Sequence, residues 1–515
     1  MQLVILHYHL NRGGVTTVVE NHLRSLALLK PEERPSRVAI VYGGRAAAWN
    51  ESVAQELPFE CSLIGVPELE YDQLRESESP LYDALQTVLQ SFDRDSTVLH
   101  VHNHSLGKNA AMAPVVCRLA DEGWRLLLQI HDFAEDLRPA NYQHLLDKAD
   151  SVEQLRGQLY PQADQIHYAV LNQRDRQIMA QAGIDDERLH LLPNPVRAPQ
   201  HLPDARQVAA SKVELMQALG VSASHRLVLY PVRPIRRKNL GELLLWSLLA
   251  GDTTFALTLA PLNSQERTAY QQWVEFATEL NLPIQFEVAN KTDLPFEEIY
   301  TAADAIITTS VAEGFGLVFL EASLAGRQLV GRSLPSVCND FEAAGMQFPG
   351  LAETMAIPVD EIDLEELRLS AARRIDQLRA AYGLPLQEQA ASPQSEAVFA
   401  GDMVDFGRLE LSQQRSFLRR VKTEADLRKT LRALNPTVQS IGALSGEDLK
   451  QTITNNCRVI AQHYSPEVIG EKLGSVYRAL LASCPSRVAC EPALAGAILD
   501  RFVHPSQLFP IRLES

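Results

Sequence analysis

The chain lacks several features that mark large classes of proteins. No apolar run in its 515 residues reaches the length needed to span a bilayer. The six cysteines are scattered, without a CxxC motif or paired Cys/His spacing, so their pattern predicts neither a disulfide framework nor a zinc site and fits a reducing cytoplasm. The first residues, MQLVILHYHLNRGG, carry no basic region before their apolar ones, so we expect no secretory signal or transit peptide.

Positive charge is also scarce. Lys and Arg total 48 against 64 Asp and Glu, which gives a formal net charge of -16. An acidic surface repels phosphate backbones and acidic membranes. The composition therefore argues against nonspecific nucleic-acid binding and against adhesion to a membrane, while a local basic site remains compatible with it.

Short apolar runs rich in Val, Ile and Leu alternate with helical patterns along most of the chain. The runs are LVILHYHL, VAIVY, VLHVHNH, LLLQIH and IHYAVLN, followed later by LVLYPV, FALTLAP and AIITTS. Such alternation predicts buried parallel strands joined by crossover helices. Prolines and polar residues interrupt the pattern in LLPNPVRAPQHLPDARQ (Leu191 to Gln207), which predicts a linker.

These patterns predict an α/β chain of two doubly wound, Rossmann-like domains that face one another across a cleft. The first domain would span residues 1–200 and the second residues 201–464, with a helical insertion at about 349–451 where the strand pattern fades. Ligands of such sheets bind at the carboxyl ends of the strands.

The stretch EGFGLVFLE (Glu313 to Glu321) follows a predicted strand and is expected to form a loop and then a helix from about Gly316. Gly314 and Gly316 permit a tight turn, and the free amides at a helix start can hold an anion such as a diphosphate. A nucleotide sugar has an anionic centre between two hydroxyl-rich ends, which would explain carboxylates on either side. The alternative is that Glu313 caps the helix and Glu321 lies on a solvated face.

A basic cluster lies between a predicted strand and helix in YPVRPIRRKNLGELLLW, and its members are Arg233, Arg236, Arg237 and Lys238. Fixed cations at the carboxyl end of a strand could neutralise a diphosphate leaving group, a role that metal ions fill in other phosphate-transfer sites. The alternative is a surface patch that pairs with nearby acids.

A glycine pair, Gly13 and Gly14, follows the first predicted strand and precedes an amphipathic helix. Glycines at this point let the backbone approach a phosphate. The segment is not the GxGxxG dinucleotide fingerprint, which weakens a nicotinamide or flavin interpretation.

Histidines are concentrated on one predicted strand of the first domain and at the end of another. His100, His102 and His104 alternate, which would put all three on one face of a strand and could in principle bind a metal. Because no carboxylate or cysteine is placed nearby, we favour one buried histidine with hydrogen-bonding neighbours and predict no metal site. His131, beside Asp132 at the end of an apolar strand, is the better candidate for the cleft, its alternative being a satisfied core histidine.

The order of these signals resembles the retaining, nucleotide-sugar-dependent glycosyltransferases of the GT-B fold, specifically family 4. EGFGLVFLE is similar to the E-x7-E motif of that family and VRPIRRKN to its Arg/Lys pair. LLPNPV is similar to the segment that enters the linker, where the family more often has Pro-Asn-Gly. The resemblance covers roughly Met1 to Arg332.

The resemblance implies a role for each matching residue. Arg233 and Lys238 would bind the donor diphosphate, and Glu321 would bind the ribose. Glu313 and His131 would be the catalytic residues, facing the transferred sugar. The other donor-binding residues would be Gly13 and Gly14 from the first domain and Gly314, Phe315, Gly316 and Leu317 from the second. No cofactor and no metal ion is implied, because the nucleotide-diphosphate sugar is a substrate.

The implied activity is that of a hexosyltransferase that moves a hexose from a nucleotide-diphosphate sugar to a hydroxyl group with retention of configuration. Residues 1–60 hold six Lys/Arg and six Asp/Glu, so no basic face for membrane docking stands out. We therefore favour a small soluble acceptor such as a sugar, polyol or hydroxy acid. The alternatives are a lipid-linked acceptor, a phosphorylase or epimerase reaction, and a non-catalytic nucleotide-sugar-binding or assembly protein.

The C-terminal region is longer than the resemblance leads us to expect. SPEVIGEKLGSVYRALLAS (Ser465 to Ser483) looks like the last helix of the family, which crosses back to the first domain, and a tail follows, so residues 465–515 form a third predicted segment. The insertion and the tail could shape an acceptor pocket or a contact in a homo-oligomer.

Overall fold

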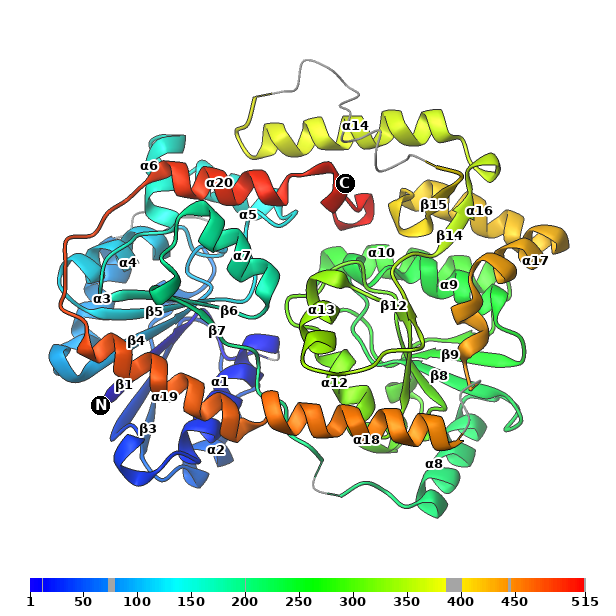
Figure 1. Cartoon of the computed structure of the whole chain (residues 1–515), viewed down its shortest axis with the longest axis horizontal. Helices are drawn as coiled ribbons and strands as arrows, with labels where there is room; N and C mark the ends of the chain where they lie inside the picture. The colour runs from blue at the N-terminus through cyan, green and yellow to red at the C-terminus, as the bar shows by residue number, and fades with distance from the viewer. Residues whose placement is uncertain (12, 73–78, 200, 386–400, 443–445, 514–515) are drawn as a thin grey trace. The chain divides into compact units, whose positions relative to one another are not determined.

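The structure is a computed structural model that describes residues 1–11, 13–72, 79–199, 201–385, 401–442 and 446–513. The chain forms two compact units (Figure 1). The first unit takes Met1–Arg197, Ile375–Gln387 and Gln462–Gln507, and the second takes Ala198–Arg374, Glu388–Ala461 and Leu508–Ser515. The boundary after Arg197 falls inside the predicted linker. The segment 465–515 is shared, because most of it belongs to the first unit and its last residues belong to the second.

The first unit is built on a seven-stranded parallel sheet of order β3-β2-β1-β4-β5-β6-β7. Its strands are β1 (Gln2–His7), β2 (Arg37–Tyr42), β3 (Glu60–Gly65), β4 (Thr97–His102), β5 (Arg125–Ile130), β6 (Ile166–Val170) and β7 (Leu189–Leu191). The strand order reverses between β1 and β4, which is the point where doubly wound sheets bind ligands. Every residue of β4, β5 and β6 is buried, as expected for central parallel strands.

Helices join the strands of the first unit, and two more come from the C-terminal part of the chain. The first group is α1 (Gly14–Ala27), α2 (Glu51–Glu56), α3 (Ser79–Leu89), α4 (Met112–Asp121), α5 (Pro139–Leu146), α6 (Val152–Leu159) and α7 (Gln173–Ala182). The second is α19 (Pro466–Ala482), which lies where the returning helix was expected, and α20 (Pro492–Phe502), which packs against α6 and α7.

Close packing holds α19 on α1. Ile469 and Leu473 of α19 share a core cluster with Leu23 of α1. Gly470 allows the helices to approach, because a Cβ atom at this position would lie 2.4 Å from the carbonyl oxygen of Ser25. Helix α19 is therefore an integral part of the first unit.

The second unit contains a six-stranded parallel sheet of order β10-β9-β8-β11-β12-β13. Its strands are β8 (Arg226–Tyr230), β9 (Thr253–Leu257), β10 (Ile284–Gln285), β11 (Ala305–Thr308), β12 (Gln328–Arg332) and β13 (Leu351–Ala352). Its helices up to this point are α8 (Ala205–Ala218), α9 (Leu240–Leu249), α10 (Ser264–Glu279), α11 (Phe296–Ala302), α12 (Leu317–Leu324) and α13 (Pro335–Ala343). The order reverses between β8 and β11. The predicted class, two doubly wound α/β sheets, is confirmed.

The region predicted as a helical insertion also contains strands. β13 belongs to the main sheet, and β14 (Ala356–Pro358) pairs antiparallel with β15 (Met403–Asp405). The helices are α14 (Leu364–Ala381), α16 (Leu411–Thr423), α17 (Ala425–Leu434) and α18 (Gly446–His463). Residues 386–400 and 443–445 of the predicted insertion lie outside the described residues.

A buried ion cluster ties β15 to the main sheet. Arg332, at the end of β12, donates two hydrogen bonds to Asp405 of β15, of 2.8 and 2.7 Å. It also donates two hydrogen bonds to Glu242 of α9, of which the one from Nε is 3.0 Å long. The arginine fork satisfies both buried carboxylates. The antiparallel pair β14–β15 is thereby fixed beside α9.

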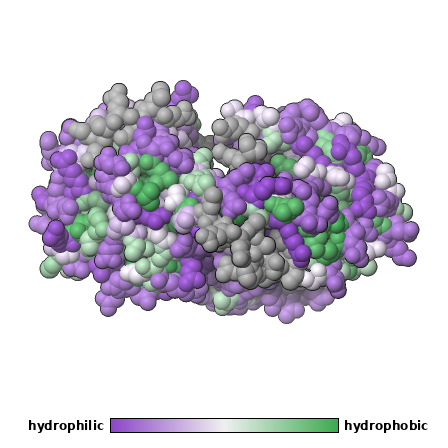
Figure 2. Space-filling model, turned by 90° about the horizontal axis from the view of Figure 1, so that it is seen from above, coloured by the Kyte–Doolittle hydropathy of each residue, from purple (hydrophilic) through white to green (hydrophobic). Residues whose placement is uncertain are grey.

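The surface in view is mostly hydrophilic. In Figure 2, hydrophilic residues predominate on the face in view, and hydrophobic residues form small separate patches. None of the described helices combines the length and the apolar character that crossing a bilayer requires.

Candidate functional site

Two cations and a carboxylate meet in the second unit at the carboxyl edge of its sheet. The cations lie on a 3-10 turn, η5 (Arg236–Lys238), which follows β8. Nζ of Lys238 forms an ion pair with the carboxylate of Glu313, and Nη2 of Arg237 lies 3.8 Å from the same carboxylate. The side chains of Glu313 and Lys238 are only 8% and 13% exposed. The basic cluster and the E-x7-E stretch therefore lie side by side, although Lys238 and Glu313 are 75 residues apart in the sequence.

Hydrogen bonds from neighbouring strands hold the basic turn in place. The hydroxyl of Tyr230, at the end of β8, donates to the carbonyl oxygen of Lys238 at 3.1 Å. The hydroxyl of Thr309, just after β11, donates to the same oxygen at 2.8 Å, and the amide of Val311 donates to the carbonyl of Arg237 at 2.9 Å. Asn239 then takes a left-handed conformation, φ 49°, before α9 begins. The position of Lys238 is thus set by the strand pair at which the sheet order reverses.

The helix of the E-x7-E stretch begins where the sequence predicts. Gly316 is the N-cap of α12 with φ 81°, and a Cβ atom there would lie 2.6 Å from Cδ2 of Phe319, so only glycine fits. Gly316 provides no side-chain cap hydrogen bond, and the carboxylate of Glu313 pairs with Lys238. The alternative in which Glu313 caps the helix is therefore wrong. Phe315 is buried and packs on Phe341 with ring centroids 5.6 Å apart.

The charges of the site shift its pKa values in different directions. Burial alone would raise the pKa of Glu313, but the charges of Lys238 and Arg237 outweigh it and lower the pKa, so the carboxylate is ionised at neutral pH. Burial lowers the pKa of Lys238 despite its pairing with Glu313. Glu321 lies in the second turn of α12 and is exposed.

The other two cations of the cluster have different contacts. Nη1 of Arg233 donates to the carbonyl oxygen of Ala260 at 3.1 Å, and Nη1 of Arg236 donates to that of Leu513 at 3.2 Å. Arg237, a member of the predicted basic cluster to which the family resemblance gave no role, is the arginine that accompanies Lys238 at the carboxylate. Its only sequence signal is its place beside Lys238. Joint binding of a diphosphate by Arg233 and Lys238 stays a prediction.

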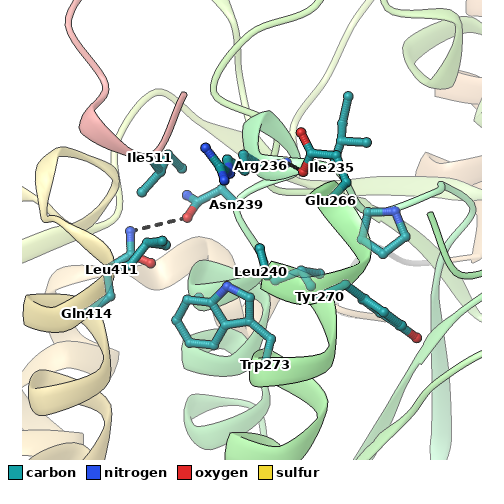
Figure 3. A pocket seen from close by; sticks show the side chains of 13 residues that line it. Ile235, Arg236, Asn239, Leu240, Glu266, Tyr270, Trp273, Leu411, Gln414 and Ile511 are labelled. Atoms are coloured by element: carbon teal, nitrogen blue, oxygen red, sulfur yellow. Dashed lines mark hydrogen bonds between the residues drawn. The ribbon is translucent and has the colours of Figure 1, made fainter. Parts of the chain in front are cut away.

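A small cavity behind the basic turn is too small for the donor. Its volume of ≈ 20 Å³ suits about one water molecule. As Figure 3 shows, side chains from α9, α10 and α16 converge on it, together with Ile511. Gln414 donates to Asn239 at 3.3 Å, and the amide of Arg236 donates to Glu266 at 3.0 Å. The side chains around this cavity support the basic turn by these hydrogen bonds.

In the first unit, the glycine pair lies at the start of α1. Gly14 is the first residue of the helix and Gly13 is its N-cap, with φ -176°. A Cβ atom on Gly14 would meet no described atom within 4 Å, so the fold itself does not require glycine there. Phosphate approach by these two residues stays a prediction.

His131 lies at the end of β5 and is 7% exposed. Its amide donates to Oδ1 of Asn103 at 2.7 Å, and its Nε2 lies 2.8 Å from Nδ1 of His102. Burial lowers its pKa to about 4, so the ring is neutral at neutral pH. The predicted position at the carboxyl end of a strand is confirmed, while its catalytic role stays a prediction.

The expectation that His100, His102 and His104 share one face is wrong for His104. Strand β4 ends at His102, and Asn103 has φ 58°, which turns the chain. Nε2 of His104 therefore bonds to the carbonyl oxygen of Leu159 at 2.8 Å, away from the other two. His22 of α1 takes its place, with its ring stacked on that of His100 at a centroid distance of 5.9 Å.

The sequence and the fold of the chain were compared with those of known proteins. No protein-family model matches the chain. Its sequence is 25% identical over 428 residues to the mannosylglucosyl-3-phosphoglycerate synthase of Petrotoga mobilis, covering 81% of this chain and 80% of that protein. Among solved structures, Anabaena HepE in complex with UDP-glucose has a TM-score of 0.56 at 13% identity, over 92% of this chain and 98% of that one.

Two further structures have similar scores. A glycosyltransferase from Rickettsia africae has a TM-score of 0.54 at 12% identity, and sucrose-phosphate synthase from Thermosynechococcus elongatus has 0.52 at 13% identity; each covers 94% of this chain and 99% of the other. The chain has the GT-B fold. The predicted resemblance to GT-B glycosyltransferases is confirmed, and membership of family 4 stays a prediction.

Proposed function

We propose that this chain is a retaining glycosyltransferase that moves a hexose from a nucleotide-diphosphate sugar to a hydroxyl group of a small soluble acceptor. The observation that carries the proposal is the cluster of Lys238, Arg237 and Glu313 at the carboxyl edge of the second sheet. It lies at the point of strand reversal, where α/β sheets bind ligands. The complex of HepE, which has the same fold, with UDP-glucose supports the donor class.

The proposed donor site assigns each end of the nucleotide sugar to a different group. Lys238 and Arg233 bind the diphosphate, with the amides at the start of α12 beside them. In the free protein Glu313 neutralises Lys238. The arriving diphosphate competes for that cation, and the released carboxylate of Glu313 accepts hydrogen bonds from the sugar hydroxyls. Glu321, which is exposed on α12, accepts hydrogen bonds from the ribose.

The proposed reaction depends on charge and position. The bond between the anomeric carbon and the diphosphate oxygen breaks as the sugar becomes oxocarbenium-like, and Lys238 stabilises the charge that develops on the leaving group. The acceptor hydroxyl attacks from the face that the diphosphate leaves, and its proton passes to the departing phosphate oxygen, which retains the configuration. Holding donor and acceptor in this geometry supplies the rest of the acceleration.

The acceptor is proposed to contain a hydroxy acid. The name of the Petrotoga relative describes a product in which two sugars are attached to a phosphorylated hydroxy acid. A sugar-bearing phosphoglycerate belongs to the small soluble acceptors that the balanced charge of residues 1–60 favours over a membrane lipid. We place the reaction in the cytoplasm, which the scattered cysteines fit.

A donor and acceptor screen tests the proposal. The purified chain is incubated with UDP-, GDP- and ADP-hexoses and with sugars, polyols, glycerate and sugar-bearing phosphoglycerates, while nucleotide release and product mass are followed. We expect release that depends on one acceptor, and its loss with donor binding kept in Glu313→Gln. Glu279→Gln, which changes an exposed glutamate paired with Arg419, is the control. Turnover that survives in Glu313→Gln would refute the assignment of this site.

A further inference from the structure

Three fully buried histidines meet in the core of the first unit. His22 comes from α1, and His100 and His102 come from alternate positions of β4, so that the strand and the helix covering it bring them together. All three are 0% exposed. One ring nitrogen from each lies within 4.8 Å of those of the other two.

Several nitrogens of this cluster lack a hydrogen-bond partner within the described part of the chain. These are both ring nitrogens of His22 and Nε2 of His102. A buried polar group without a partner costs about 1–3 kcal/mol. His22 lies next to Leu23 on α1, which belongs to an aliphatic core cluster. An aliphatic side chain would serve a purely structural position there better than histidine, so the unpaired nitrogens point to a ligand.

We propose that His22, His100 and His102 form a binding site for one divalent metal ion of the zinc class. Imidazole nitrogen is a preferred ligand of Zn²⁺, Co²⁺, Ni²⁺ and Cu²⁺. Ca²⁺ and Mg²⁺ prefer oxygen ligands, and this cluster offers no carboxylate. Burial lowers the pKa of each of the three rings, so they are neutral at neutral pH and their lone pairs can bind a cation.

Surrounding residues hold the ring of His100 in orientation. Nε2 of His100 lies 2.9 Å from Oε1 of Gln129, and its Nδ1 lies 2.8 Å from the hydroxyl of Tyr477. Binding a metal uses one of these nitrogens and leaves the other bond to fix the ring, as is common around metal-bound histidines. The hydroxyl of Tyr477 adds an oxygen donor beside the cluster.

The site would also position His131. Nδ1 of His102 bonds to Nε2 of His131 at 2.8 Å, which leaves Nε2 of His102 for the metal. A metal that fixes the ring of His102 therefore fixes a hydrogen bond to the residue at the strand end. Because the three ligands are fully buried, the metal acts through position and not by touching a substrate. The inference stands independently of the proposed transfer reaction.

Metal content of the full chain tests the inference. The protein is stripped with a chelator, reconstituted with Zn²⁺, freed of excess metal and assayed by mass spectrometry, and Co²⁺ is titrated with visible absorption as readout. We expect about one tightly bound equivalent, and an affinity at least about tenfold lower in His22→Leu. His190→Leu is the matched control. Nε2 of His190 lies 2.9 Å from Nδ1 of His167 in the same unit, and among the described residues this partly buried pair is not part of a group of three metal-binding side chains.

The outcomes separate a built site from surface binding. Retention of zinc in the wild type and in His190→Leu, with loss in His22→Leu, supports the site. Absence of bound zinc in the wild type, or equal binding in His22→Leu, overturns it. If His22→Leu does not fold by circular dichroism, the wild type decides: intense visible bands of four-coordinate Co²⁺ support the site, and the weak bands of the hydrated ion contradict it.

Discussion

Replacing Lys238 by methionine keeps an unbranched side chain that is one atom shorter and removes its charge. In the wild type, Nζ pairs with a carboxylate, that of Glu313, which is 8% exposed. Two unit charges about 4 Å apart attract by about 4 kcal/mol at an effective dielectric constant of about 20, and desolvation offsets part of this. Because Arg237 remains 3.8 Å from Glu313, we expect a loss of about 1–3 kcal/mol in the free energy of unfolding, the cost of a partly compensated buried group.

Donor affinity should fall as well. A hydrogen bond to a charged group contributes about 1.5–3 kcal/mol, which corresponds to about 10- to 150-fold in the dissociation constant of the nucleotide sugar. The lower end is expected, because Glu313 competes for Lys238 in the free protein. Calorimetric titration with the donor that the screen identifies measures this change.

Lys212→Met is the matched control. Lys212 pairs with Asp304 in the same unit at 2.6 Å and is 25% exposed, but it belongs to α8 and not to the basic turn. Its loss should leave the donor dissociation constant unchanged. Equal donor affinity in Lys238→Met and the wild type, with both proteins folded, would refute the reasoning.

The same substitution changes the pH dependence of stability. The folded pKa of Glu313 is lowered, so its contribution is present above the unfolded pKa and is lost as the pH falls through the folded value. In Lys238→Met the folded pKa rises, and the pH-dependent contribution shrinks. Urea unfolding of the two proteins between neutral and acidic pH should therefore differ most at neutral pH and converge toward acid.

Three further predictions concern the fold around the site. Gly316→Ala should lower the free energy of unfolding by about 2–4 kcal/mol, because it adds a steric clash to a left-handed φ. Gly326→Ala should lower it by only about 1–2 kcal/mol, because Gly326 has φ 69° but no described atom within 4 Å of the added Cβ. Urea unfolding of the two variants measures the difference. Arg332→Met leaves the buried carboxylates of Glu242 and Asp405 without their arginine and should lower the free energy of unfolding by about 3–5 kcal/mol, more at pH 8 than at pH 5. A loss that does not depend on pH would contradict the ion cluster. Burial raises the pKa of Glu242 to about 7, so its contribution to the free energy of unfolding should decline as the pH rises from its unfolded pKa to about 7. The difference in the free energy of unfolding between the wild type and Glu242→Gln should therefore change over this pH range. A difference that does not depend on pH would contradict this.

Much of the fold could be predicted because local patterns determine it. Alternating apolar runs and helical segments are sufficient for two parallel sheets, since fully buried strands need continuous apolar sequence. The start of α12 was predictable because a tight turn before a helix requires a residue such as Gly316. That Glu313 and Lys238 both lie at the carboxyl edge of the sheet was predictable from their positions after predicted strands, whereas their ion pair was not predicted.

The rest depends on contacts between distant parts of the chain. Four cations lie close together in the sequence, and hydrogen bonds from Tyr230 and Thr309 decide which of them reach Glu313. His22 joined the histidines of β4 only because α1 covers that strand, a pairing that no local spacing encodes. The partner of Arg332 in β15 lies 73 residues away, across segments that sequence patterns described only as helical.

Transfer of a sugar by this chain is measured most simply as the mass of the acceptor after incubation with donor and protein. We expect that an acceptor of the sugar or hydroxy-acid class gains the mass of one hexose and that nucleotide diphosphate is released only when this acceptor is present. Glu313→Gln should abolish the gain while still binding donor. Donor binding without any gain of mass across the acceptor panel, in a folded protein, would contradict it and would favour a nucleotide-sugar-binding protein.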